Sequence, residues 1–174
     1  MLIPDRGTLS RLDFNPISIE AVAARTKWLV GLGLEQPVGA VGQDTFFFQQ
    51  MLFYARKVAT VNQPVYAYYA AVSGSVVNVI SPKYFRKYLL LEEARSAWME
   101  EVGLLEDYRR VRLEFFFKKW YLRKLAFVPP ENYEEAAEVV SQLGRMYGEH
   151  EWQDPAIREF WRSRKGTVPA TPIS

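Results

Sequence analysis

From Ser81 onward the sequence is punctuated as a series of helices, and this restricts the fold more than any other feature. Ser81 is a good N-cap residue, and Pro82 follows at the first helical position, where its missing N–H costs nothing. Between such signals we predict four helices, over residues 82–102, 105–126, 131–147 and 155–162. Glycine or proline ends the first three, at Gly103, Pro129-Pro130 and Gly148. The second part of the chain is therefore expected to be an antiparallel helical bundle.

Residues 1–80 have a mixed pattern. We predict one helix from Ile19 to about Val30, capped by Ser18, and a second from Asp44 or Thr45 to about Lys57. Two short runs rich in β-branched and aromatic residues follow, Val58–Val61 and Val65–Ala71, separated by Asn62-Gln63-Pro64. The expected fold class is α+β: a small β-hairpin with two flanking helices, followed by the helical bundle.

Composition removes several classes of chemistry. The 174 residues contain no cysteine and one histidine, His150, which we expect at the surface in a polar loop. Disulfides, cysteine zinc sites and multi-histidine metal sites are excluded. The net charge of +2 implies no bulk binding of nucleic acid. No apolar run reaches the length of about 18 residues that a membrane span needs, and no signal peptide is evident, so we expect a cytoplasmic location or the inner face of the membrane.

One segment, residues 42–78, carries a family resemblance. Four elements follow one another in order: Gly42-Gln43-Asp44, Tyr54-Ala55-Arg56-Lys57, Val65-Tyr66-Ala67-Tyr68-Tyr69 and Ser73-Gly74-Ser75. This order and spacing resemble the second half of the inverting family 2 glycosyltransferases, which have the GT-A fold. Gln43 stands where that family has Glu, and Tyr69 stands where it has Arg.

The resemblance implies a role for each of these residues. Asp44 would be the general base that takes the proton from the acceptor hydroxyl during an inverting transfer. Substrate-binding positions would be Gln43, Thr45, Tyr69, Ser73 and Ser75. Independently of the resemblance, Asp44 can be read simply as an N-cap residue.

The nucleotide-binding half of such an enzyme is not evident in this sequence. No Asp-x-Asp motif occurs, and 43 residues precede Asp44. We therefore expect residues 1–80 to be the acceptor-side part of a GT-A-like catalytic domain, residues 81–165 a helical C-terminal extension, and residues 166–174 a disordered tail. The chain itself is expected to hold no metal or cofactor. A Mg²⁺ or Mn²⁺ ion, a nucleotide-diphosphate sugar and a surface or lipid-linked glycan acceptor would belong to the complete enzyme.

A basic and aromatic stretch supports an alternative. Seven basic residues between Arg109 and Lys124 alternate with Phe115, Phe116, Phe117, Trp120 and Tyr121. We interpret the stretch first as part of the bundle core with solvated basic residues at its edges, and we expect Phe117 and Trp120 to be buried. The second interpretation is docking on a membrane surface, and the third is nucleic-acid binding. The alternative function is accordingly a non-catalytic helical interaction module or a membrane-associated module.

Overall fold

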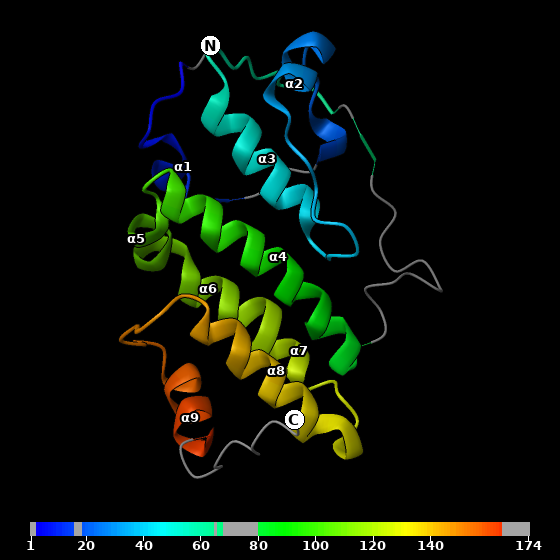
Figure 1. Cartoon of the computed structure of the whole chain (residues 1–174), viewed down its shortest axis with the longest axis vertical. Helices are drawn as coiled ribbons and strands as arrows, with labels where there is room; N and C mark the ends of the chain where they lie inside the picture. Colours follow the sequence, from blue (N-terminus) through cyan, green and yellow to red (C-terminus); the bar gives the residue numbers. More distant parts are fainter. Residues whose placement is uncertain (1–2, 16–18, 65, 68–79, 165–174) are drawn as a thin grey trace.

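The structure, a computed structural model, describes residues 3–15, 19–64, 66–67 and 80–164, and its regular elements are helical (Figure 1). The first part of the chain contains α1 (Thr8–Arg11), the 3₁₀ turn η1 (Ile19–Ala21), α2 (Thr26–Leu32) and α3 (Gln43–Tyr54). The second part contains α4 (Pro82–Glu101), α5 (Leu105–Tyr108), η3 (Arg109–Leu113), α6 (Glu114–Phe116), η4 (Phe117–Leu122), α7 (Arg123–Leu125), η5 (Pro130–Asn132), α8 (Tyr133–Arg145) and α9 (Pro155–Arg164).

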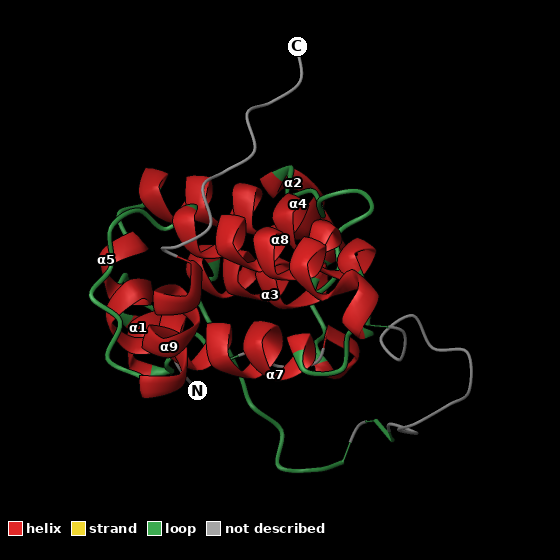
Figure 2. Cartoon of the chain, turned by 90° about the horizontal axis from the view of Figure 1, so that it is seen from below, coloured by secondary structure: helices red, strands yellow, loops and turns green. Residues whose placement is uncertain are grey.

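Three long helical segments form the centre of the molecule. The first is α4, the second is the continuous rod from α5 to α7, and the third is α8 (Figure 1). The rod runs back along α4, and α8 reverses direction again, so that α4 and α8 lie side by side (Figure 2). The end of the rod at α7 lies in a second layer against them, and α9 packs on the rod at η4. The predicted helical character of this part is confirmed.

Local punctuation explains where the long helices begin and end. Ser81 is extended, with φ −151° and ψ 172°, and Pro82 opens α4. After α4 the chain turns through Gly103 at φ 69°, a left-handed conformation that glycine adopts without strain, and the N–H of Leu104 donates to the carbonyl of Met99 over 2.7 Å. The observed helix bounds differ from the predicted ones by no more than about two residues here, which is the usual uncertainty of helix ends.

The rod is not a regular α-helix. Two stretches, Arg109–Leu113 and Phe117–Leu122, have π-helical hydrogen bonding, in which each backbone hydrogen bond spans one residue more than in an α-helix. Its buried aromatic and aliphatic side chains consequently recur at uneven intervals, at Tyr108, Leu113, Phe116, Phe117, Tyr121 and Leu125. Phe117 is fully buried, as predicted, whereas Trp120 is only partly buried. A helical wheel drawn with about 3.6 residues per turn therefore does not separate the buried residues of the rod from its exposed residues.

The expected α+β class is wrong. Within the described residues no strand is present: Val58–Val61 is irregular apart from a single bridge residue, Val58. The second expected strand, Val65–Ala71, lies largely outside the described residues. β-Branched sequence is stabilised as a strand by pairing with a neighbour and by burying one face, and Ala59, Thr60 and Val61 are exposed. High β-propensity alone did not produce a hairpin here.

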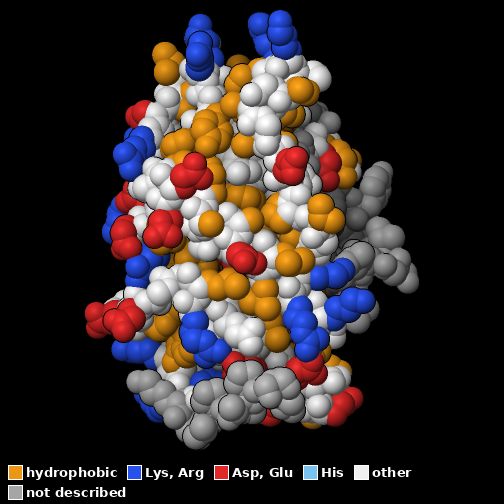
Figure 3. Space-filling view, viewed as in Figure 1, with side chains coloured by type: hydrophobic (Ala, Val, Ile, Leu, Met, Phe, Trp, Pro, Cys, Tyr) orange, Lys and Arg blue, Asp and Glu red, His pale blue; other side chains and the backbone are white. Residues whose placement is uncertain are grey.

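The first part of the chain also differs from the prediction in its helices. In place of one helix from residue 19 to 30, the chain forms η1 and then α2, which ends at Gly33 in the left-handed conformation (φ 62°). Helix α2 buries none of its residues, and Val30 is 75% exposed. The space-filling view shows hydrophobic side chains reaching the surface in this region (Figure 3).

A buried polar network ties the long helices together. The carboxylate of Glu92 and the guanidinium of Arg95, both on α4 and both almost inaccessible to solvent, form an ion pair, and Arg95 Nε lies 3.0 Å from Glu92 Oε2. The hydroxyls of Tyr121, from the rod, and Tyr147, from the turn that follows α8, both donate to the same carboxylate. Burial by itself lowers the pKa of Arg95, but the adjacent Glu92 carboxylate raises it well above its usual range. The network therefore holds a fixed charge pair inside the core.

Candidate functional site

Asp44 lies in the first turn of α3, the helix that the Gly-Gln-Asp motif opens. Helix α3 begins at Gln43, and Gly42 occupies the N-cap position with φ 80°. Asp44 is thus the second helical residue, two positions beyond the N-cap, and no capping hydrogen bond from a side chain is present. Its charge lies near the positive end of the helix dipole, which stabilises a carboxylate there.

Gly42 sets the position of this turn against α4. Its left-handed backbone conformation is strained for other residues, and a Cβ atom at this position would lie 3.3 Å from a methyl carbon of Leu91 and 3.6 Å from the ring of Tyr88. Glycine therefore permits both the sharp entry into α3 and the close approach of the backbone to α4.

The rest of α3 is anchored by aromatic packing. Phe46 and Phe53 meet the indole of Trp98, on α4, edge to face, with ring centroids 5.7 and 5.5 Å apart. The Nε1 atom of Trp98 donates to the hydroxyl of Tyr54 over 3.3 Å. Gln49 is buried and donates from Nε2 to the carbonyl of Phe14 over 3.0 Å. These contacts fix the helix that carries Asp44 while leaving its first turn at the surface.

The Asp44 carboxylate is available for chemistry. The residue is half-buried, and its side chain forms no hydrogen bond or ion pair with any other residue that the structure describes. Gln43 and Thr45, the flanking residues of the same turn, are also half-buried. One unpaired carboxylate held at a helix start can accept a proton from a hydroxyl placed within hydrogen-bond distance.

The remaining predicted site residues are not placed with Asp44. Tyr69, Ser73 and Ser75 lie outside the described residues. In the second element of the resemblance, Tyr54-Ala55-Arg56-Lys57, Tyr54 is the last residue of α3, and Arg56 and Lys57 follow it at the surface. The predicted acceptor loop therefore stays a prediction.

The described residues contain no cluster of ligands for the divalent cation that the resemblance implies for a complete enzyme. Nowhere in the described ranges do three or more His, Asp or Glu side chains gather in a group that could hold a metal ion. A Mg²⁺ ion that neutralises a diphosphate is usually bound by one or two carboxylates together with the phosphate oxygens. We therefore assign no step to a metal in this chain. A helix long and apolar enough to cross a membrane is likewise absent from the described part of the chain.

Sequence reasoning missed a cavity elsewhere in the fold. A cavity of about 670 Å³ lies between the end of α8 and α9 rather than at Asp44. His150, expected as an exposed loop residue, lines this cavity with its side chain only 16% exposed. Its ring meets Trp152 edge to face at 4.6 Å, and its Nε2 lies 3.4 Å from a carboxylate oxygen of Glu114. The two tryptophans Trp152 and Trp161, nine residues apart, were the available sequence signal.

Comparison with known proteins gives one partial match. Over 68 residues, 39% of this chain, the sequence is 37% identical to a protein of Bacillus subtilis (strain 168) named "Putative glycosyltransferase EpsH". Part of this chain is thus similar to a protein that bears a glycosyltransferase name. The match covers 20% of that relative's length, so the chain spans a minor part of the protein it resembles. No family model matches the chain, and no solved structure matches it.

Proposed function

We propose that this chain is the acceptor-side, C-terminal part of a glycosyltransferase, with Asp44 as the general base of an inverting transfer from a nucleotide-diphosphate sugar. The observation that carries the proposal is the state of Asp44: a half-buried carboxylate without a partner among the described residues, in the first turn of a helix anchored to the core. The partial relationship to a named glycosyltransferase supports the same reading.

In this proposal Asp44 acts as a proton acceptor. The acceptor hydroxyl would donate its hydrogen bond to Asp44 and transfer its proton as the oxygen attacks the sugar carbon. Gln43 and Thr45 lie on either side in sequence, with amide and hydroxyl groups that can bind further hydroxyls of a glycan. The pyrophosphate and any cation would be bound by a separate nucleotide-binding half, because the described residues provide no carboxylate cluster for them.

The substitution Asp44→Asn tests the proposal in the chain combined with a nucleotide-binding half. Asparagine retains the shape and removes the base, so turnover should fall by about 10²–10⁴-fold. Stability should fall by less than about 1 kcal/mol, which is the value of one carboxylate at a helix N-terminus. Transfer rates and thermal melts would be measured on the same preparations.

A matched control is available on another helix. Asp107→Asn removes an exposed carboxylate of α5 that pairs with Arg110, and it should leave turnover unchanged at a similarly small cost in stability. Parental turnover in the Asp44→Asn protein would show that Asp44 only stabilises the start of α3.

A second candidate function, membrane association, is favoured by the surface of the rod. Phe115 is 50% exposed, with the guanidinium of Arg112 4.4 Å and the ammonium of Lys119 5.3 Å from its ring centroid. Exposed aromatic rings beside cations can bind an anionic bilayer surface. Co-sedimentation with vesicles containing phosphatidylserine would test this, and equal sedimentation of a Phe115→Ser variant would oppose it.

A further inference from the structure

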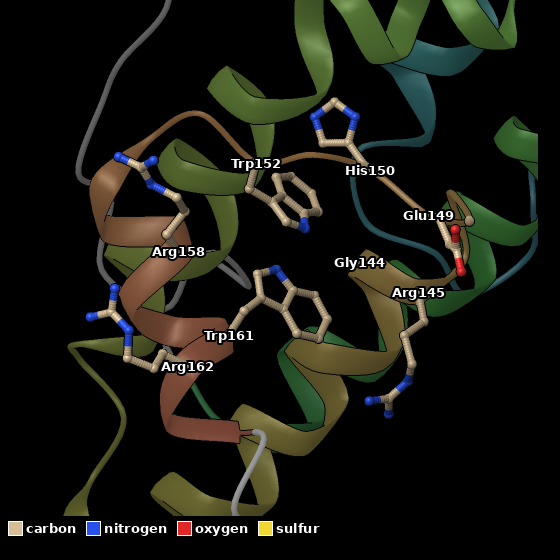
Figure 4. A pocket seen from close by; sticks show the side chains of 9 residues that line it. Gly144, Arg145, Glu149, His150, Trp152, Arg158, Trp161 and Arg162 are labelled. Atoms are coloured by element: carbon tan, nitrogen blue, oxygen red, sulfur yellow. The ribbon is translucent and has the colours of Figure 1, made fainter.

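The cavity between α8 and α9 has an aromatic floor. The indoles of Trp152 and Trp161 are nearly parallel, with ring centroids 6.2 Å apart and planes inclined by 23°, and both are partly exposed (Figure 4). Phe117, from the rod, lies beneath them at 4.9 and 6.3 Å. Trp152 and Trp161 thus form the aromatic surface of the cavity, and Phe117 supports them from the core.

A glycine makes this floor possible. A Cβ atom at Gly144, on α8, would lie 2.5 Å from a ring carbon of Trp161 and 3.1 Å from one of Phe117. Any larger residue would displace the indole, since real Cβ atoms do not approach so closely. The absence of a side chain at Gly144 lets Trp161 lie directly on α8 and fixes its position in the cavity.

Charged side chains also line the cavity. Arg158 and Arg162 lie on the α9 side, and Arg145 and Glu149 lie on the α8 side (Figure 4). Arg145 pairs with Glu138 and Arg162 pairs with Glu159, whereas Arg158 is exposed and has no ion pair with another described residue. Arg158 is therefore the unpaired cation among the lining residues, and Glu149 is the carboxylate among them.

We propose that this cavity binds a sugar ring that carries a carboxylate, such as a uronic acid residue of a glycan. The apolar C–H face of the ring would lie on the tryptophans, whose ring faces carry the negative part of the aromatic quadrupole. The carboxylate would accept a forked pair of hydrogen bonds from Arg158, a geometry that guanidinium groups favour. The ring hydroxyls would donate to Glu149, which can only accept.

Glu149 favours a carboxylate sugar over phosphate-bearing ligands. A phosphate monoester carries up to two negative charges, whereas a sugar carboxylate carries one. The Glu149 carboxylate, which lines the same cavity, therefore repels the phosphate more strongly. A neutral sugar would leave Arg158 without its partner. The cavity volume lies within the range of ordinary small-ligand sites. The inference does not involve Asp44 and stands or falls separately from the proposed transferase function.

Binding of a galacturonate trisaccharide to the full chain tests the inference, with a galactose trisaccharide, inorganic phosphate and UMP as comparison probes. Two of the five tryptophans line the cavity, so fluorescence should change on binding, and calorimetry should give the affinity. We expect the galacturonate probe to bind best and its affinity to fall as ionic strength rises.

Two variants locate the site. Arg158→Gln should weaken galacturonate binding about tenfold or more without altering the thermal melt, because a charge-assisted hydrogen bond is lost at an exposed position. Arg25→Gln, the same change at an exposed arginine beside α2, should bind as the parent does. Trp152→Leu should weaken galacturonate and galactose probes alike, and circular dichroism would verify that it folds.

Three outcomes would refute the proposed binding of a carboxylate sugar. Tighter binding of phosphate or UMP than of galacturonate would refute a carboxylate sugar as the ligand. Equal affinity of the parent and the Arg158→Gln protein would remove the arginine from the site. No heat and no fluorescence change at about 10 mM galacturonate trisaccharide would refute the site itself.

Discussion

Removing Arg95 from the buried network should destabilise the protein strongly. Arg95 is 1% exposed and Glu92 is fully buried, so Arg95→Met leaves a carboxylate in the core without its counter-ion. Breaking a buried ion pair from one side costs about 3–5 kcal/mol. The guanidinium also lies 4.5 Å from the ring centroid of Phe116, and this cation–π contact is lost as well. For a chain of this length the melting temperature should fall by about 6–20 °C.

Removing the rest of the network separates the cost of the unpaired charge from the cost of lost packing. Glu92→Leu combined with Arg95→Met eliminates both charges but leaves the hydroxyls of Tyr121 and Tyr147 buried and unpaired, at about 1–3 kcal/mol each. Adding Tyr121→Phe and Tyr147→Phe removes those groups too. The fourfold variant should regain most of the lost stability, because an apolar replacement of a buried ion pair is often neutral or stabilising.

Urea unfolding of the parent, the single variant and the fourfold variant gives the three free energies. Arg110→Met is the control: Arg110 is exposed and paired at i,i+3 with Asp107, so its loss should cost less than about 1 kcal/mol. A loss below about 1 kcal/mol for Arg95→Met would refute the view that the network is closed to water. A fourfold variant as unstable as the single variant would show that packing, rather than the unpaired charge, sets the cost.

Three further predictions concern the core. Burial raises the pKa of the Tyr121 and Tyr147 phenols well above their usual range, and the nearby Glu92 carboxylate raises it further. The stability that these neutral phenols contribute is therefore complete below about pH 10 and falls above it by about 1.4 kcal/mol per pH unit for each phenol. Urea unfolding between about pH 9 and 11 measures this loss, and a free energy of unfolding that does not change with pH would contradict it. Gly144→Ala should cost about 1–3 kcal/mol through the clash with the indole on α9, and a neutral effect on the thermal melt would show that α9 can move away. Phe117→Ala should cost about 3–5 kcal/mol, and Trp120→Ala distinctly less, because only Phe117 is fully buried; equal losses in chemical denaturation would oppose this order.

The candidate site was predictable only in part. The motif Gly42-Gln43-Asp44 predicted a carboxylate at the start of a helix, and the structure places Asp44 in the first turn of α3. The N-cap itself is Gly42 rather than Asp44 or Thr45, and its left-handed conformation (φ 80°) is one that glycine adopts without strain. The two tryptophans that line the cavity between α8 and α9 were its available sequence signal, but they did not locate it, since its walls depend on how α9 packs against α8.

By itself the sequence determined the long helices, because their limits are set by local chemistry. Ser81-Pro82 starts α4, Gly103 ends it in a left-handed turn, and Pro129 stops the rod, all through backbone geometry within a few residues. Tertiary structure alone decided what depends on distant partners. Residues 58–61 have strand-forming side chains, yet pairing there is limited to a bridge at Val58, because a strand needs several paired residues and a buried face. Glu92 is buried because Tyr147, 55 residues later in the chain, reaches its carboxylate, and no local pattern encodes that meeting.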